Sequence, residues 1–300
     1  MKTWISLLAR TACVLFAFFV ANSVHAQSIP TDTTVVVELE TTDGNTFIGR
    51  VIKTDDNNIV LRTGNLGDIN ILRRNIRNIT PIDQKKLVDG DYWYESPIDV
   101  RYFFNSNAYG IRKGEGYYQN TALLLNQVAY GVTNNITIGG GFIPLFLFGG
   151  SPTPVWATVK GSIPIKKDKF NIGVGGLFAT VIGEENASFG VVYGNATVGS
   201  RDRNFNVGIG YGYAGDELGR VPAINFSGIY RTGKTFALIT ENYLVTDGEN
   251  SVFTGGLGVR FIGKKVVIDG ALIVPYSELD EFFVAIPWLG VTFPFGTKKR

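Results

Sequence analysis

The sequence predicts an all-β protein whose longer part is an up-and-down antiparallel barrel. From Ile98 onward, turn residues divide the chain into segments of about 9–16 residues, longer than the five or six usual in soluble strands. In the clearest segments, large apolar residues alternate with Gly, Asn, Ser and Thr. The sequence contains neither an apolar run of about 18 residues nor a sustained 3.6-residue period, so long helices are not expected.

The amino terminus has the features of a secretory signal peptide. Lys2 and Arg10 supply positive charge, and Thr11 to Ala21 form an apolar run of 11 residues. That run is too short to span a bilayer as a helix, which needs about 20 residues. Val24-His25-Ala26 then places small residues at the −3 and −1 positions of a cleavage site. We therefore predict a signal peptide over residues 1–26 and export of the rest.

Cleavage after Ala26 limits the chemistry of the exported protein. The sequence has one Cys, one His and one Met, and all three (Cys13, His25 and Met1) lie in the removed segment. Disulfides, Cys/His zinc sites, Cys nucleophiles and Ser–His catalysis are therefore excluded. We expect neither an enzyme nor a cofactor or metal site. Cleavage also removes two of the 28 basic residues, which leaves as many as the 26 acidic ones, so no nucleic-acid partner is expected.

Residues 33–82 form a first domain of short strands separated by turns. Asp43-Gly44-Asn45 and Asp55 to Asn58 are turn sequences, and Gly64 to Gly67 supply another. Five short strands in about 50 residues predict a small, strongly bent barrel. A basic cluster near its end (Arg73, Arg74 and Arg77) is interpreted as a solvated strand end.

The pattern ELETTDGNTFIGRV…NNIVLRT…GDINILRRNIRNI in this domain resembles the Sm-like and SH3-like small barrels. The resemblance lies in strand spacing, not in chemistry, so the RNA binding of Sm proteins is not carried over. A connector, residues 83–97, follows and contains Tyr92, Trp93 and Tyr94. These aromatic residues are expected either at a membrane interface or packed on the small domain.

The predicted barrel covers residues 98–300. Its strands are 98–106, 117–132, 135–146, 153–164, 169–182, 187–199, 204–213, 220–231, 234–245, 251–262, 265–274 and 282–295. In 204–213, every second residue is Phe, Val, Ile or Tyr, and the residues between are Asn or Gly. A soluble sandwich would place charged residues on its outer face. Small polar residues opposite an apolar face instead predict a polar lumen inside a lipid-facing band.

The turns carry a second pattern, because their charge alternates along the chain. Every other turn is short and basic, namely 165–169, 200–203, 231–234 and 262–265. The intervening connections are acidic, with Glu184-Glu185, Asp216-Glu217, Asp247 with Glu249, and Glu278 with Asp280 and Glu281. Up-and-down connection gives such a barrel one basic and one acidic rim. Short turns face the periplasm in bacterial outer-membrane barrels, so the basic rim and the C-terminal tail are placed there.

Parity of the turns gives 12 strands, with 10 as the alternative. A periplasmic small domain requires strand 98–106 to cross first, which makes residues 107–116 an external loop. With the final strand FFVAIPWLGVTFPF and aromatic-flanked strands before it, Ile98 to Phe295 resemble the outer-membrane β-barrel proteins of the porin-like class. The resemblance implies the cell outer membrane as location, its lipid as partner, and a channel or structural function. The small domain is then expected to bind another envelope component.

Four charged residues are candidates for the lumen: Lys160, Glu241, Arg260 and Asp269. The assigned faces direct Lys160, Arg260 and Asp269 inward, and Glu241 lies one strand further on. A buried charge needs a partner, so this cluster is expected either to plug the lumen or to line a polar path.

Two other functions remain open. One is a soluble secreted all-β binding protein, and the other is an outer-membrane lipid-modifying enzyme, although the exported chain has no His for the latter.

Overall fold

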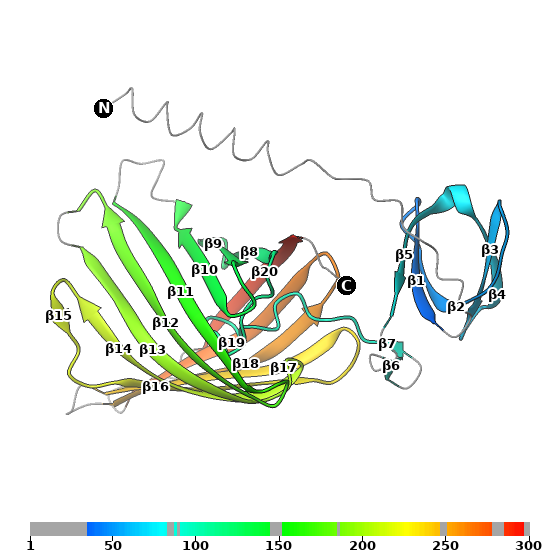
Figure 1. Cartoon of the computed structure of the whole chain (residues 1–300). Helices are drawn as coiled ribbons and strands as arrows, with labels where there is room; N and C mark the ends of the chain where they lie inside the picture. The colour runs from blue at the N-terminus through cyan, green and yellow to red at the C-terminus, as the bar shows by residue number, and fades with distance from the viewer. Residues whose placement is uncertain are drawn as a thin grey trace, which may run out of the picture. The chain divides into compact units, whose positions relative to one another are not determined.

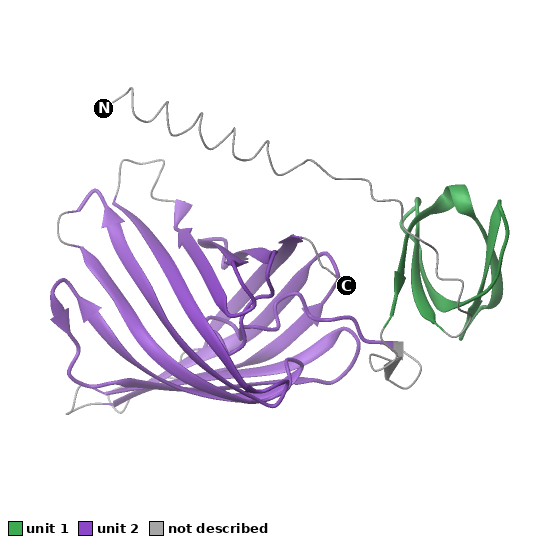
Figure 2. Cartoon of the chain, in the orientation of Figure 1, with its two compact units in different colours: residues 1–90 green, residues 91–300 purple. Residues whose placement is uncertain are grey.

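The structure, a computed structural model, describes residues 35–82, 87–88, 91–144, 152–184, 187–246, 251–277 and 285–296. The chain divides into two compact units, residues 1–90 and 91–300 (Figure 2). The predicted signal peptide 1–26 lies outside the described residues, as do residues 83–86 and 89–90 of the predicted connector. No helix in the described ranges is long and apolar enough to cross a membrane.

The first unit contains one five-stranded antiparallel sheet in the order β4-β3-β2-β1-β5. Its strands are β1 (Val36–Thr41), β2 (Thr46–Thr54), β3 (Asn58–Thr63), β4 (Gly67–Leu72) and β5 (Ile76–Pro81). The predicted Asp43-Gly44-Asn45 turn joins β1 to β2, and Gly44 there has a φ of 89°, which favours glycine. A single 3₁₀ turn, Arg73–Asn75, joins β4 to β5.

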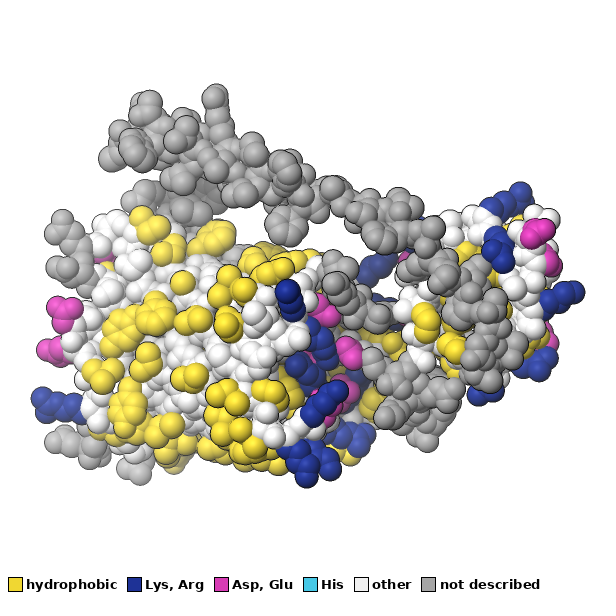
Figure 3. Space-filling model, viewed as in Figure 1, with side chains coloured by type: hydrophobic (Ala, Val, Ile, Leu, Met, Phe, Trp, Pro, Cys, Tyr) yellow, Lys and Arg dark blue, Asp and Glu magenta, His cyan; other side chains and the backbone are white. Residues whose placement is uncertain are grey.

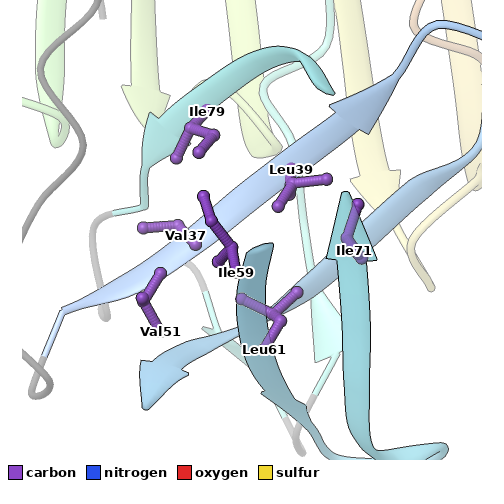
Figure 4. Close-up of a cluster of buried hydrophobic side chains, with 7 residues drawn as sticks. All are labelled: Val37, Leu39, Val51, Ile59, Leu61, Ile71 and Ile79. Atoms are coloured by element: carbon purple, nitrogen blue, oxygen red, sulfur yellow. The ribbon is translucent and has the colours of Figure 1, made fainter. Parts of the chain in front are cut away.

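Aliphatic side chains from this sheet form the buried core of the first unit. The core consists of Val37, Leu39, Val51, Ile59, Leu61, Ile71 and Ile79 (Figure 4). Two residues of the predicted basic cluster lie at the surface and bind partners within this unit. Arg73 donates to the backbone oxygen of Asp55, and Arg77 pairs with Glu40. A short pair, β6 (Leu87–Val88) with β7 (Asp91–Tyr92), follows β5 in the chain.

The second unit is a closed antiparallel barrel of 12 strands, which confirms the predicted fold class and strand number (Figure 1). Its members are β8 (Glu115–Thr121), β9 (Leu125–Gly131), β10 (Ile136–Phe142), β11 (Thr153–Lys166), β12 (Phe170–Ile182), β13 (Ser188–Gly199), β14 (Arg203–Ala214), β16 (Ala223–Arg231), β17 (Phe236–Thr246), β18 (Ser251–Ile262), β19 (Val267–Ser277) and β20 (Ile286–Gly296). Pairing of β20 with β8 joins the first strand to the last, and every other neighbour is consecutive. A two-residue strand, β15 (Glu217–Leu218), extends only the end of β14.

Two of the predicted strands are wrong. One is not a barrel strand and the other is two strands, so the predicted total of 12 is still correct. Residues 98–106 are not a barrel strand, and residues 117–132 form two strands, β8 and β9, instead of one. The turn between them has left-handed backbone at Ala122 (φ 51°) and Leu123 (φ 62°), a conformation that non-glycine residues seldom adopt. Nothing in Thr121 to Leu125 (TALLL) is a turn-forming residue type, so local sequence does not predict this turn.

Alternate turns lie at opposite ends of the barrel because all neighbouring strands are antiparallel. The basic turns after β11, β13, β16 and β18 share one end, here called the basic end, with the start of β8 and the end of β20. Glu184, Asp216 and Glu217 lie at the other end. The remaining predicted acidic residues, Glu185, Asp247, Glu249, Glu278, Asp280 and Glu281, lie outside the described residues.

Candidate functional site: the plugged lumen

Residues 94–113, here called the plug segment, run through the interior of the barrel. Tyr94 donates a hydrogen bond to the backbone oxygen of Ile262 in β18, and at the far end of the segment the Lys113 amide donates to Asn134. Between these points the chain makes a tight turn, in which the Tyr102 amide donates to the Asn105 oxygen. Ile98, Tyr102, Phe103 and Ala108 are completely or almost completely buried. The predicted external loop 107–116 is therefore also wrong, because residues 107–111 are buried in this segment.

Arg260 of β18 anchors the first half of the plug segment. Its guanidinium donates to the backbone oxygens of Ile98 (3.0 Å), Arg101 (2.9 Å) and Tyr102 (2.7 Å). The same guanidinium forms a bidentate ion pair with the carboxylate of Asp269 in β19, at 2.7 Å and 3.0 Å. Arg260 and Asp269 lie directly opposite each other on adjacent strands, so strand pairing alone places them together, independently of the plug segment.

Glu241 of β17 holds the turn. Its carboxylate accepts hydrogen bonds from the amides of Phe103 (2.7 Å), Phe104 (3.0 Å) and Asn105 (3.0 Å). The hydroxyl of Tyr243 donates to the same carboxylate. An irregular segment inside a barrel has backbone groups that no strand can satisfy, and Glu241 supplies the acceptors that these three amides need.

Lys160 of β11 anchors the second half. Its ammonium donates to the backbone oxygens of Asn107 (3.0 Å) and Tyr109 (2.7 Å). The four lumen candidates of the sequence analysis thus all lie buried inside the barrel, and three of them contact the plug segment directly while Asp269 acts through Arg260. They do not form one cluster, because each meets a different part of the segment.

Asp99 and two arginines fix the plug segment near the basic end. Asp99 lies 2.8 Å from Arg201, in the turn between β13 and β14, and 3.2 Å from Arg112. Burial alone raises the pKa of the Asp99 carboxyl, but the positive charges of Arg201 and Arg112 outweigh it and hold that pKa below its usual value. Asp99 is therefore ionised at neutral pH, and it joins the plug segment to the barrel through Arg201.

Polar side chains of the wall bind further backbone groups of the plug segment. Asn195 donates to the oxygen of Ser106, while Thr197 and Thr137 accept hydrogen bonds from the amides of Ala108 and Ile111. At Gly131 of β9 the plug segment passes so close that a Cβ atom would collide with the backbone oxygens of Ile111 and Arg112. The Gly, Asn and Thr face predicted as a polar lumen is, at these places, the surface that receives the segment.

Sequence reasoning missed Asp99, Arg101, Arg112, Arg201 and Arg231 as interior residues. Arg231 is completely buried, and it donates to the backbone oxygen of Tyr94 and pairs with Asp202 at 2.9 Å. One signal was present: in 98–106 the face opposite Ile98, Val100 and Tyr102 carries two charges, Asp99 and Arg101, on successive positions of that face.

A cavity of about 420 Å³ lies beside the plug segment. Its lining includes Arg101, Phe104 and Asn105 of the segment and wall residues such as Trp156, Leu177 and Val191. Most of these wall residues come from the half of each strand that lies away from the basic end. The lumen therefore has a polar half filled by chain and a largely apolar half that is hollow. Among the described residues, no group of three or more His, Cys, Asp or Glu is placed to hold a metal ion.

No protein-family model and no curated protein matches this sequence. Solved structures that resemble the chain include a KdgM porin, at 8% identity and a TM-score of 0.44, with 61% of this chain and 98% of that chain covered. A NanC porin matches at 12% identity and a TM-score of 0.41 over 60% of this chain and 98% of that one. OmpT of Vibrio cholerae matches at 11% and 0.34, over 90% and 100%. These values are too low to support a conclusion about function, which has to come from the barrel itself.

Proposed function

We propose that this protein is an outer-membrane β-barrel of channel type, held closed by the plug segment. The observation that carries the proposal is the exterior of the barrel, where large apolar side chains are exposed on every long strand. Val174, Leu257, Leu272 and Leu289 are each more than half exposed. Figure 3 shows apolar side chains spread over one outer face of the barrel, with charged groups toward its edges.

Water does not normally meet so large an apolar surface. Soluble monomers seldom expose contiguous apolar patches of more than a few hundred Å². In outer-membrane barrels an outward apolar band faces lipid, and strands of 11 to 14 residues, such as β17 and β11, are long enough to cross a bilayer. Aromatic pairs on this outer surface, such as Phe236 with Phe261, fit the same setting.

The proposed orientation follows from the turns. Turns at the basic end are short, and short turns face the periplasm in such barrels. Because β8 begins and β20 finishes at the basic end, the first unit is attached on the periplasmic side. We propose that this unit, whose five consecutive strands support the Sm-like or SH3-like resemblance, binds another envelope component there.

Conductance in planar bilayers tests the channel. The wild-type protein is expected to conduct weakly, because the plug segment fills the polar half of the lumen. Glu241→Gln removes the charged acceptor of the Phe103, Phe104 and Asn105 amides, so conductance is expected to rise severalfold. Glu217→Gln, at the opposite end from the basic turns, is the matched control and should change nothing.

Solubility separates this proposal from the alternatives. A barrel in lipid should need detergent for extraction and migrate differently in gels before and after heating. A mature protein that stays monomeric in water without detergent would contradict the proposal and favour a secreted binding protein. Hydrolysis of phospholipid by the purified protein would favour the enzyme.

A further inference from the structure

The cavity in the apolar half of the lumen has an unusual charge balance. Arg101 and Lys160 line it, and among the described lining residues they are the only charged ones. Both are buried, with 6% and 5% of their surface exposed. Two basic side chains therefore face a space whose described lining contains no carboxylate.

The other buried basic residues of the described barrel all have an acidic partner. Arg260 pairs with Asp269 at 2.7 Å, and Arg231 pairs with Asp202 at 2.9 Å. Neither Arg101 nor Lys160 lies within ion-pair distance of a carboxylate in the described part of the chain. A buried charge without a counter-charge is costly, so this difference points to a partner from outside the chain.

The hydrogen bonds of Arg101 leave one of its donors unused. Its Nη atoms donate to the Tyr117 hydroxyl (3.3 Å) and to the backbone oxygens of Phe103 and Phe104 (3.0 Å each), and the Gln127 amide lies beside them. Its Nε–H is buried and has no acceptor among the described residues. Lys160 donates only to two backbone oxygens, so one of its three N–H donors is left over.

Most of the remaining exposed cavity wall is apolar, although polar residues such as Gln127, Thr158 and Asn225 also line it. Trp156, Leu177 and Val191 contribute from β11, β12 and β13, and Phe104 contributes from the plug segment. A volume of about 420 Å³ lies within the range of about 300–1,000 Å³ for small-molecule sites. The site thus combines two basic side chains with a mostly apolar wall.

We propose that this cavity binds an amphiphilic monocarboxylic acid, with its carboxylate between Arg101 and Lys160 and its apolar body against Trp156, Leu177 and Val191. A guanidinium suits a carboxylate because its N–H groups form a planar fork. The inference deepens the proposed function, since it names the class of molecule that the barrel admits. The ligand would also act on the plug segment, because Arg101 belongs to that segment. A bound carboxylate would shield the charge of Arg101 or release its side chain from its present hydrogen bonds.

Quenching of Trp156 fluorescence tests the site in the purified full-length mature protein in a non-ionic detergent. Trp93→Phe with Trp288→Phe leaves Trp156 as the only tryptophan after residue 26. In this background, 11-bromoundecanoic acid should quench at a concentration at least tenfold lower than 11-bromoundecanol, which has the same body without the charge. Arg101→Gln and Lys160→Gln should each reduce the affinity for the acid severalfold, and together bring it to that of the alcohol.

Two controls guard against a mere structural effect. Lys166→Gln removes an exposed positive charge from the same strand as Lys160 and should leave acid binding unchanged. Arg101→Lys keeps the charge and should retain a preference for the acid. Equal quenching by acid and alcohol in the parent protein, a preference that survives the double variant, or no quenching by either compound would each overturn the inference.

The failures of the two proposals can be told apart. A protein that neither needs detergent nor shows heat-modified migration contradicts the membrane barrel itself. A protein that passes those tests but shows no acid preference contradicts only the ligand.

Discussion

Strands of the small unit and strands of the barrel both alternate large apolar residues with others, but they direct the apolar side chains to opposite places. In the small unit, Leu39 and Leu61 point to the interior and are completely buried. In the barrel, Leu257 and Val259 of β18 point out, while Arg260 between Val259 and Phe261 is completely buried. The same two-residue period thus places apolar side chains inside the small unit and outside the barrel. The difference fits water around the small unit and, as we propose, lipid around the barrel.

The difference extends to what holds each interior together. Aliphatic packing fills the small unit, and its stability comes from apolar area removed from water. In the barrel the polar half of the interior is held by ion pairs and by charged side chains that bind backbone groups of the plug segment. Equivalent substitutions should consequently differ in their cost to stability between the two units.

The largest effect is expected for Arg260→Ala. The change leaves Asp269 buried without a partner and removes three hydrogen bonds to the plug segment. Removing one partner of a buried ion pair costs about 3–5 kcal/mol. The free energy of unfolding, measured by urea titration in lipid vesicles, should fall by about that amount.

A double variant, Arg260→Met with Asp269→Leu, provides the control for Arg260→Ala. It removes both charges together, so it should recover part of the lost stability while still loosening the plug segment. If Arg260→Ala is as stable as the wild type, the ion pair does not support the barrel in the way described.

A smaller effect separates two leucines that are equally exposed in the structure. Leu257 of the barrel is 68% exposed and Leu66 of the small unit is 64% exposed. Leu257 lies near the middle of β18, so Leu257→Arg would place a charge near the centre of the bilayer, at a cost of about 2–4 kcal/mol. Leu66→Arg places the same charge in water and should change the stability of its unit by about 0.5 kcal/mol at most.

Unfolding by urea in vesicles measures the first variant, and thermal unfolding followed by circular dichroism measures the second. Similar small effects at both positions would mean that water surrounds the barrel, and would favour the secreted binding protein over the membrane channel.

The sequence predicted most of the barrel because the barrel strands are long and have a strict two-residue period. Ten of the 12 predicted strands correspond to single strands of the structure, from β10 at Ile136–Phe142 to β20 at Ile286–Gly296. The first two predicted strands failed for different reasons. The turn at Ala122 and Leu123 is made by residue types that rarely adopt its backbone, so local sequence could not reveal it.

The plug segment failed for another reason, because its conformation depends on partners distant in sequence. Apolar and charged residues alternate over 98–101, as they would in a strand. In the structure their neighbours are Arg260 and Arg201, which lie more than 100 residues further on, and no local rule relates them. Lys160, Glu241, Arg260 and Asp269 could be proposed as interior residues from alternation alone, but their partners in the plug segment could not.

The smallest expected effect concerns pH and Asp99. Its pKa in the folded protein lies below the ordinary value of about 3.9, because Arg201 and Arg112 stabilise the charged form. The contribution of Asp99 is therefore fully present above pH 4–5 and is lost as the pH falls through the lowered pKa. Arg260 and Lys160 bind other parts of the plug segment, so loss of the Asp99 charge should loosen it only near the basic end.

Conductance of single barrels in planar bilayers between pH 7 and pH 3 measures this effect, with a modest rise expected at the acid end. Asp99→Asn is the matched variant: its amide cannot ionise, so its conductance should be slightly raised already at pH 7 and should depend less on pH. The part of the response that Asp99→Asn removes is the part that belongs to Asp99. A full pH response in that variant would assign the acid effect to other groups, and would leave the Asp99 ion pairs without a part in holding the plug segment.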